Sequence, residues 1–427
     1  MTVVVKGGRV IDETGERRAD VAIAEGRIAE VGPDLDTTGA TVLDAGDCVV
    51  SPGFVDLHTH LREPGREEAE TVESGARAAA LGGFTAVVAM PNTEPAIDSA
   101  AVVRQVLDAG AKATCEVHVA GSITVGREGR RLSPMAELAD LGVRLFTDDG
   151  CGVQDDRLMR RALEYAGGLG VTLAQHCEVE ALSEGGHMHE GEWSSRLGIP
   201  GVPAEAEELM VFRDIALSRL TGTRVHIQHL STAGSVELVR AAKAKGLPVT
   251  AEATPHHLSL THAEVAGYNP VFKVNPPLRR AEDVAAVRAG LADGTIDAIA
   301  TDHAPHTQEV KEHPFDQAPC GMLGLETALG VALTSLTDHM DLPAVIGALT
   351  WKPAAIAHLQ STQGGAVTAG RPANLCVFDP TERWTVEPAR SASRSRNTPF
   401  AGRELTGRVR HTVLRGEPVV VAGEAQR

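Results

Sequence analysis

The feature that most constrains the fold is a repeated alternation of apolar, strand-like runs with alanine-rich helical stretches. Helical stretches such as 71–81, 157–169, 205–220 and 323–336 lie between the runs. Runs that stay apolar throughout are typical of a parallel sheet whose two faces are both buried. The runs end at or near eight residues: His58, Met90, Gly121, Asp149, His176, His229, Thr254 and Asp302. Eight strand–helix units predict a TIM (β/α)8 barrel.

The two ends of the chain have a different pattern. Residues 1–50 contain short β-like runs separated by charged turns, and they predict a small antiparallel β unit. β character returns in residues 359–427. Because neither end has enough apolar area to fold alone, we predict one small β-sandwich domain built from both ends, with the barrel at 51–358. The apolar run from Cys48 to Val55 is expected to be a single buried strand.

Two connections between predicted strands are longer than the others. They leave inserted loops at about 183–203 and 256–280, which are expected to cover a substrate. His187 and His189 in the first loop are expected to face solvent. His257 in the second loop could either contact the substrate or stiffen the loop.

The composition excludes several classes of partner. The chain has 40 basic and 57 acidic residues, a formal net charge of −17, which argues against nucleic-acid or anionic-membrane partners. The sequence has no apolar stretch of membrane-spanning length and no signal-peptide pattern at its start, and its six cysteines are scattered. These features predict a cytoplasmic protein with reduced thiols. An anionic substrate would need local positive charge.

The residues at the predicted strand ends indicate metal chemistry. His58 and His60 are two apart, so on a strand both imidazoles project to the same side. Barrel active sites lie where strands finish, and the other strand-end residues include imidazoles, carboxylates and an amide. They are Asn92, Asp149, His176, His229 and Asp302. Four histidines and two carboxylates can hold two divalent ions, for which zinc is the expected metal.

The strand-end motifs carry a resemblance to a known family. Gly53–Gly65, which contains the histidine pair and Arg62, resembles the opening metal motif of dihydroorotases, cyclic amidohydrolases of the amidohydrolase superfamily. Further stretches match in the same order: Met90–Thr93, Phe146–Gly150, Gln175–Glu178, Gln228–Ser231, Ala253–Leu258, Lys273–Arg279 and Ala300–His306. The resemblance covers nearly the whole chain.

The resemblance implies a role for each of these residues. His58 and His60 would bind the first metal with Asp302, His176 and His229 the second, and Asp149 would bridge the two. Asp149 is preferred to Asp148 because of its spacing before His176. Asp302 would also be the catalytic proton shuttle. The residues implied to hold the substrate are His60, Arg62, Asn92, Asn275, His306, Cys320 and Gly321.

The implied reaction is the reversible ring closure of N-carbamoyl-L-aspartate to L-dihydroorotate, the third step of de novo pyrimidine synthesis. One alternative is a hydantoinase or allantoinase, but such relatives usually carry a bridging lysine, and Val143–Val153 contains none. Another is an inactive homologue that assists aspartate transcarbamoylase. The expected partners are the small substrate and further copies of the chain, with aspartate transcarbamoylase as a candidate protein partner.

Overall fold

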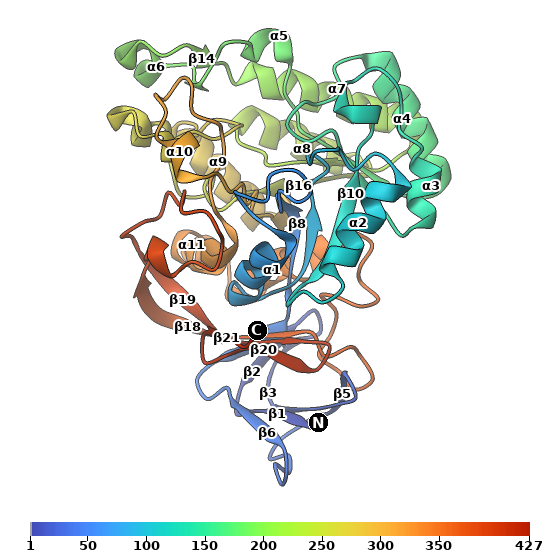
Figure 1. The fold of residues 1–427 in the computed structure, drawn as a ribbon, viewed down its shortest axis with the longest axis vertical. Helices are drawn as coiled ribbons and strands as arrows, with labels where there is room; N and C mark the ends of the chain where they lie inside the picture. The colour runs from blue at the N-terminus through green and yellow to red at the C-terminus, as the bar shows by residue number, and fades with distance from the viewer. Residues whose placement is uncertain (1) are drawn as a thin grey trace.

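The computed structural model describes residues 2–427, and its central element is an eight-stranded parallel sheet. The strands are β8 (Phe54–Thr59), β9 (Phe84–Ala89), β10 (Glu116–Gly121), β11 (Leu145–Phe146), β12 (Thr172–Gln175), β15 (Val225–Ile227), β16 (Val249–Ala253) and β17 (Ala298–Ile299). Just beyond their ends the first and last strands meet, because His60 N–H donates to His303 O at 2.9 Å. The sheet therefore closes into the predicted barrel (Figure 1).

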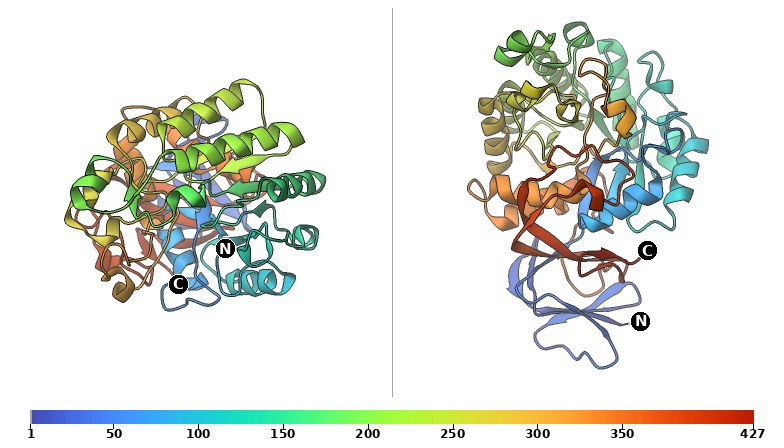
Figure 2. Two further views of the ribbon diagram at one scale, coloured as in Figure 1. Left: turned by 90° about the horizontal axis from the view of Figure 1, so that it is seen from above. Right: turned by 60° about the vertical axis from the view of Figure 1, so that its left-hand side comes forward.

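Helices surround the barrel, as the alternation predicts (Figure 2, left). Several begin where a side chain caps the first turn: Thr71 Oγ1 accepts from Ser74 N, and Asp155 accepts from Leu158 N. The helices of the ring are α1 (Val72–Leu81), α2 (Ala100–Gly110), α3 (Met135–Asp140), α4 (Asp156–Leu169), α7 (Glu205–Thr221), α8 (Ala233–Ala244), α9 (Ala281–Ala292), α11 (Ala328–Leu336), α12 (Leu342–Leu349) and α13 (Trp351–Ile356). The helix predicted over 323–336 begins only at Ala328, because η4 (Leu325–Thr327) is a separate 3-10 turn.

Both ends of the chain form a β-sandwich below the barrel in Figure 1. One sheet has the order β5-β4-β1-β6, from β1 (Val3–Lys6), β4 (Asp20–Ala24), β5 (Arg27–Gly32) and β6 (Thr41–Asp44). The other has the order β21-β20-β19-β18-β7-β2-β3, from β2 (Arg9–Asp12), β3 (Gly15–Arg18), β7 (Val49–Pro52), β18 (Leu375–Thr385), β19 (Glu404–Leu414), β20 (Glu417–Val421) and β21 (Glu424–Ala425). The exact domain limits at 50/51 and 358/359 stay predictions.

Two details of the sandwich differ from the predictions. The N-terminal unit is not purely antiparallel, because β1 pairs with β6 and β2 pairs with β7 in parallel. The run from Cys48 to Val55 is two strands, β7 in the sandwich and β8 in the barrel. The break falls at Gly53, where a Cβ atom would overlap the side chain of Thr85.

The inserted segments contain short elements. The first holds α5 (Glu180–Ser183), β13 (Met188–His189), α6 (Glu192–Leu197) and β14 (Gly201–Val202), and the second holds η2 (His262–Gly267) and η3 (Pro270–Phe272). Three other short helices are η1 (Val125–Arg127), α10 (Gln308–Lys311) and η5 (Pro388–Arg390). The prediction for His189 is wrong: its side chain is buried between Arg279 and Arg280, 3.2 and 3.0 Å away. Over residues 2–427, no helix is long and apolar enough to span a membrane.

Candidate metal centre and active site

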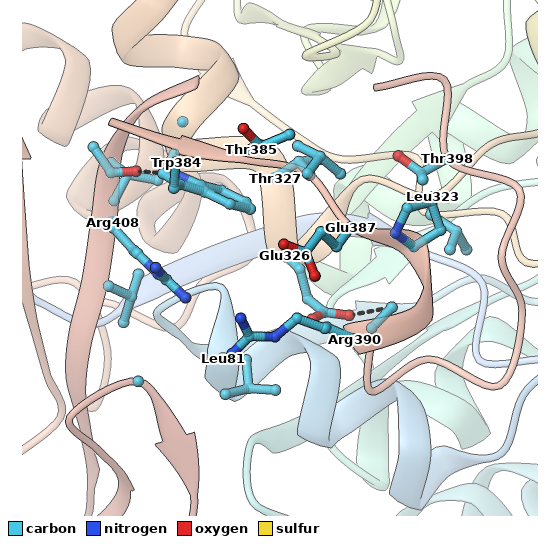
Figure 3. A pocket seen from close by; sticks show the side chains of 18 of the residues that line it. Leu81, Leu323, Glu326, Thr327, Trp384, Thr385, Glu387, Arg390, Thr398 and Arg408 are labelled. Atoms are coloured by element: carbon cyan, nitrogen blue, oxygen red, sulfur yellow. Dashed lines mark hydrogen bonds between the residues drawn. The ribbon is translucent and has the colours of Figure 1, made fainter. Parts of the chain in front are cut away.

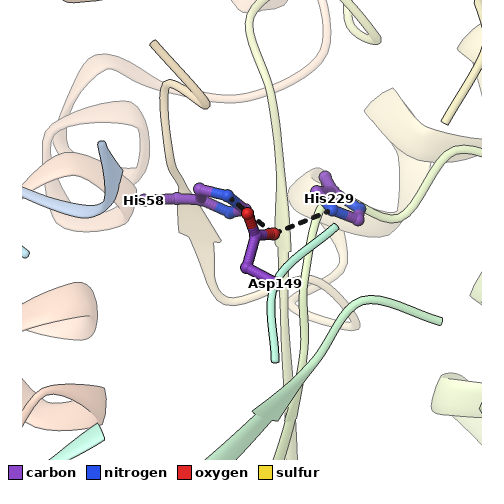
Figure 4. Close-up of side chains that lie close together, drawn as sticks. All are labelled: His58, Asp149 and His229. Atoms are coloured by element: carbon purple, nitrogen blue, oxygen red, sulfur yellow. Dashed lines mark ion pairs between the residues drawn. The ribbon is translucent and has the colours of Figure 1, made fainter. Parts of the chain in front are cut away.

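The predicted ligands converge at the carboxyl ends of the barrel strands. His58 belongs to β8 and His60 follows it directly, while Asp149, His229 and Asp302 stand shortly after β11, β15 and β17. His176 follows β12 directly. Two sets of side chains present ligand atoms close enough to share an ion: His58, Asp149 and His229, drawn in Figure 4, and His58, His60 and Asp302. The barrel thus brings together groups from distant parts of the sequence.

The set of His58, His60 and Asp302 has the composition expected for the first metal. His60 Nε2 lies 3.0 Å from Asp302 Oδ1, and His58 Nε2 lies 3.4 Å from the same oxygen. All three side chains are buried. The backbone of Asp302 has φ 45°, a left-handed conformation that a residue other than glycine adopts only when its surroundings impose it.

Asp149 lies between the two histidine pairs. Its Oδ1 is 3.2 Å from His58 Nε2, 3.9 Å from His176 Nδ1 and 4.0 Å from His229 Nε2. Its Oδ2 is 3.6 Å from His60 Nε2. Oδ1 thus faces His58, His176 and His229, and Oδ2 faces His60, so this one carboxylate is within reach of both histidine pairs.

The neighbouring Asp148 points away from this cluster. Its Oδ1 accepts from the backbone N–H groups of Ile123 and Thr124 at 2.8 and 3.0 Å, and its Oδ2 accepts from the Thr124 hydroxyl. Asp148 therefore holds the segment after β10, whereas Asp149 faces the histidines.

The two members of the second histidine pair, His176 and His229, do not belong to the same compact set of ligands. His176 Nδ1 and His229 Nε2 are 2.8 Å apart. The compact set that contains His229 includes His58 and Asp149 rather than His176. His176 is also approached by the Asn275 amide, whose Nδ2 lies 3.3 Å from His176 Nε2.

A buried carboxylate that the sequence analysis missed orients His58. His58 Nδ1 lies 2.9 Å from Glu252 Oε1, and because a carboxylate accepts, this nitrogen carries the proton. The lone pair of His58 Nε2 is then available to a metal, as in many carboxylate–histidine–metal arrangements. Glu252 Oε2 in turn lies 3.0 Å from Nε2 of the buried His226. An acidic residue inside the apolar run 248–253 was the signal that could have identified Glu252.

Asn92 orients His60 in the same way. His60 Nδ1 lies 2.8 Å from Asn92 Oδ1, and Asn92 Nδ2 donates to Asp149 Oδ2 at 3.2 Å. The amide thereby links His60 to Asp149. Both of its polar atoms are used within the cluster, and its contact with substrate stays a prediction.

The charges of the cluster stabilise one another. Burial raises the pKa of Asp149, but the facing His58, His60 and His176 outweigh it and bring the pKa well below its usual value. Burial likewise opposes ionisation of Asp302, and His58 and His60 again lower the pKa. Burial together with the neighbouring imidazoles lowers the pKa of His229 to about 3. The carboxylates are thus ionised and His229 is neutral, which are the forms that bind metal.

The donor set fits divalent metal ions. It consists of imidazole nitrogens and carboxylate oxygens, which suit zinc and similar first-row metals. His58 Nε2 is buried and has no hydrogen-bond partner among residues 2–427, although two carboxylates lie near it. A buried polar atom left without a hydrogen bond is costly, and coordination of an ion would satisfy it.

The predicted carboxylate clamp lies beside this cluster. Arg62 is buried, and its Nε donates to Pro305 O at 3.1 Å. His306 Nε2 lies 3.4 Å from Arg62 Nη2 and donates to Cys320 O at 2.7 Å. Burial and the charge of Arg62 lower the pKa of His306 to about 2, so this imidazole is neutral. Arg62 and His306 both line a cavity of about 370 Å³.

The remaining predicted substrate contacts come from loops. Gly321 follows Cys320 with φ 133°, and a Cβ atom there would lie 2.9 Å from His306 Nε2. Only a residue without a side chain therefore allows this close approach. The loop that carries Asn275 is fixed by a hydrogen bond, because His257 Nε2 donates to Pro276 O at 3.0 Å. His257 therefore stiffens the loop, and a contact between His257 and substrate stays a prediction.

A buried arginine anchors the same loop. Arg279 Nε donates to Ser231 Oγ at 3.0 Å, and its Nη2 lies 3.6 Å from Glu207 Oε2. Glu207 belongs to α7 and also accepts from the backbone N–H of Ser231 at 3.1 Å. The segment that follows His229 is therefore tied both to an outer helix and to the loop of Asn275.

Another cavity, of about 580 Å³ and thus larger than the one beside Arg62, lies elsewhere (Figure 3). It is enclosed by α11 and the strands β18 and β19, and Trp384, Glu326 and Arg390 line it. His303, the neighbour of Asp302 in sequence, reaches its wall, but the candidate ligand groups are at the strand ends. Cavity size alone would therefore point to the wrong place.

Comparisons with known proteins place the chain in a family. A family model described as Dihydro-orotase-like matches residues 47–235. The chain is 50% identical to a dihydroorotase of Pelotomaculum thermopropionicum over 425 residues, covering 98% of this chain and 99% of the relative. It is also 50% identical to a dihydroorotase of Streptomyces coelicolor over 426 residues, covering 99% of both chains.

A solved structure shares the architecture over the same length. L-hydantoinase (dihydropyrimidinase) from Arthrobacter aurescens superimposes with a TM-score of 0.90 at 25% identity, covering 100% of this chain and 97% of that one. Identity is thus twice as high to dihydroorotases as to this hydantoinase. The chain belongs to the dihydroorotase family of cyclic amide hydrolases.

Proposed function

We propose that the strand-end cluster catalyses the reversible cyclisation of N-carbamoyl-L-aspartate to L-dihydroorotate. The observation that carries the proposal is the position of Asp149 between two histidine pairs, with the buried guanidinium of Arg62 beside them. A site of this kind can activate water and also hold an anionic substrate. The near-50% identity to dihydroorotases supports the choice of this substrate pair.

Two zinc ions are the proposed cofactors. His58, His60 and Asp302 would hold one ion, His176 and His229 the other, and Asp149 would bridge them. When bound, such ions lower the pKa of a coordinated water and polarise a carbonyl group. Glu252 and Asn92 would keep the imidazoles of His58 and His60 in the correct tautomer.

Asp302 is the proposed proton shuttle. In the direction of ring opening, water attacks the ring amide carbonyl carbon and Asp302 accepts a proton from that water. The carbon–nitrogen bond then breaks, and Asp302 returns the proton to the departing nitrogen, so that one water is consumed and a carboxylic acid and a ureido group are formed; the acid ionises to a carboxylate by releasing its proton to solvent. The lowered pKa of Asp302 keeps its carboxylate ionised at neutral pH.

Arg62 is the proposed anchor for the substrate's free carboxylate. Its pKa is lowered by burial to about 10, so that it remains a cation at neutral pH. A guanidinium can bind a carboxylate with two parallel hydrogen bonds. In a chain with a net charge of −17, such a local cation is needed to retain an anionic substrate. His60, Asn92, Asn275, His306 and the backbone of Cys320 and Gly321 would complete the pocket.

The nearest alternative is hydantoinase or allantoinase activity. The sequence argues against it, because Val143–Val153 contains no lysine that could serve as a carboxylated bridge. Hydantoin and allantoin also lack the free carboxylate that Arg62 would bind. The experiment that separates these functions is a turnover assay on dihydroorotate, hydantoin and allantoin, with metal content measured in the same sample. Turnover of dihydroorotate alone supports the proposal, and preferential turnover of either other ring overturns it.

A non-enzymatic alternative is an inactive partner of aspartate transcarbamoylase. Such a protein is expected to have lost ligands, whereas all six predicted ligands are present and lie together. Cytoplasmic location, assembly of the chain with itself and association with aspartate transcarbamoylase also remain proposals. The acidic charge is consistent with the absence of nucleic-acid partners.

A further inference from the structure

The chain between β18 and β19 leaves the sandwich and runs beside α11 toward the mouth of the barrel, where the carboxyl ends of its strands lie (Figure 1). In this segment Ser393, Ser395 and Asn397 are buried. Arg394 and Arg396, which lie between them, are exposed. Alternation of this kind is typical of an extended chain with one face turned inward. The inner face is polar, so hydrogen bonds rather than apolar packing hold the segment in place.

The two serines attach the segment to the loop before α1. The hydroxyl of Ser393 donates to the buried carboxylate of Glu70. Ser395 Oγ donates to Ala69 O at 2.8 Å. Asn397 follows two residues later, and these bonds therefore bring it to a fixed position beside the mouth.

The Asn397 side chain uses its hydrogen-bonding groups on two loops of the mouth. Its Nδ2 donates to Ala304 O at 3.0 Å and to Gly321 O at 3.2 Å. Its Oδ1 accepts from the backbone N–H of His306 at 3.2 Å. The backbone oxygen of Asn397 also accepts from Leu323 N–H at 3.1 Å. An amide supplies two N–H donors and a carbonyl acceptor, which is the set that these backbone groups require.

The first of these loops orients the candidate carboxylate clamp. Ala304 and His306 flank Pro305, whose carbonyl oxygen accepts from Arg62 Nε at 3.1 Å. Asn397 thus holds the backbone on both sides of the group that fixes the guanidinium. It also fixes the backbone that carries the His306 imidazole.

The second loop carries the candidate contacts with the substrate ring. Gly321 N–H donates to Lys273 O at 2.9 Å, while Gly321 O accepts from Asn397. His306 Nε2 donates to the adjacent Cys320 O at 2.7 Å. The backbone of this turn is therefore fixed from two sides, and Asn397 supplies one of them.

We infer that Asn397 is a positioning residue for substrate binding, which fixes the loops of His306 and Gly321. A site whose groups are already held in the binding geometry loses less conformational entropy when the ligand binds. The inference rests on the proposed function, because these two loops are part of the proposed substrate pocket. It extends the active site to the chain segment between two sandwich strands.

The catalytic carboxylate is held independently of Asn397. Thr301, which precedes Asp302, donates its N–H and its hydroxyl to Asp56 at 2.8 and 2.5 Å. Within residues 2–427, no hydrogen bond of Asn397 reaches a candidate metal ligand. Loss of the amide should therefore weaken substrate binding more than it slows the chemical step.

The test compares Asn397→Ala with a matched control, Asn374→Ala. Asn374 is also buried, and its amide bonds Thr362 O and Arg415 N–H at 2.9 and 2.7 Å. It lies away from the mouth, because its backbone oxygen accepts from Gly53 N–H just before β8 begins. Asn397→Ala is expected to raise KM for dihydroorotate about tenfold, with kcat changed less than about threefold and wild-type metal content. Asn374→Ala is expected to lower the melting temperature comparably and to leave KM unchanged.

Asn397→Ser is the milder variant, because its hydroxyl retains one donor and one acceptor. Its KM is expected to lie between the wild-type and alanine values. A wild-type KM in a folded Asn397 variant, or an equal rise of KM in the Asn374 variant, overturns the inference. Failure of both Asn397 variants to fold would give the amide a purely structural role and overturn it too. If the wild-type chain hydrolyses hydantoin or allantoin instead, the proposed function fails, and the same KM comparison on that ring still tests Asn397.

Discussion

The mouth of the barrel and the interior of the sandwich are equally buried but have opposite chemistry. The six candidate ligands at the mouth are at most 6% exposed, and all of them can ionise. The apolar cluster inside the sandwich is as inaccessible, yet it consists mainly of aliphatic side chains such as Val5, Val21 and Leu43. Buried ionisable groups are tolerated only where they neutralise and hydrogen-bond one another, or bind an ion.

The two regions therefore have different roles, one in stability and the other in the reaction. The sandwich holds both ends of the chain together through apolar packing. This packing stabilises the fold and takes no part in catalysis. The mouth concentrates charge in a low-dielectric setting, where electrostatic effects on a reaction are large. Substitutions at the mouth should therefore change turnover more than stability, and substitutions in the sandwich should do the reverse.

The largest expected effect is that of Asp302→Asn. The amide has nearly the same size as the carboxylate but cannot accept the proton from water, so kcat should fall about 10³-fold or more. The melting temperature should change little. Steady-state kinetics and thermal unfolding on the same preparation check both statements. Substantial residual turnover would show that another group shuttles the proton.

Leu43→Ala should have the opposite effect, with a lower free energy of unfolding and an unchanged kcat. Leu43 is 1% exposed in the sandwich core, so its truncation leaves a cavity and should lower the free energy of unfolding by about 3 kcal/mol. Values of kcat for the folded enzyme should be unchanged. Urea unfolding measures the stability, and Val42→Ala, at the adjacent and 46% exposed position, is the control. An equal loss in both variants would contradict the assigned packing.

Arg62→Met should affect binding of substrate more than the chemical step. Loss of a bidentate guanidinium–carboxylate contact should raise KM about 100-fold, with a much smaller change in kcat. Arg66 lines the same cavity but is exposed, so Arg66→Met is the control and should have little effect. An unchanged KM in the Arg62 variant would show that Arg62 does not bind the substrate's carboxylate.

Glu252→Gln should have the smallest effect of the four. The glutamine can still hydrogen-bond His58 but no longer supplies the negative charge behind the imidazole. Metal affinity should therefore fall about tenfold, as it does for other partners of metal-bound histidines. A chelator titration that follows metal release measures this, with Glu326→Gln in the large cavity as the control. Identical release curves would show that Glu252 serves packing alone.

Much of this architecture could be predicted because parallel strands buried on both faces have a simple sequence pattern. The apolar runs predict the barrel, and the strand-end rule then brings His58, Asp149 and Asp302 to one mouth. These inferences need no knowledge of which strands are neighbours. The closed barrel and the family membership are both confirmed.

The errors arise where local pattern gives no information on distant partners. An apolar run does not reveal that Gly53 divides it between two domains, since the division depends on the close approach of Thr85. Strand direction in the sandwich depends on pairings such as β2 with β7, which alternation does not encode. His189 is buried by Arg279, which is 90 residues away in the sequence.

The central claim is that Asp149 bridges two metal ions at the mouth of the barrel, and metal stoichiometry tests it most directly. Asp148→Asn and Asp149→Asn are adjacent, isosteric changes that differ in which way the side chain points. Elemental analysis of the purified proteins should find two divalent ions per chain in the wild type and in Asp148→Asn, and a clear loss in Asp149→Asn. Full metal content in the Asp149 variant, or metal loss only in the Asp148 variant, would contradict the account.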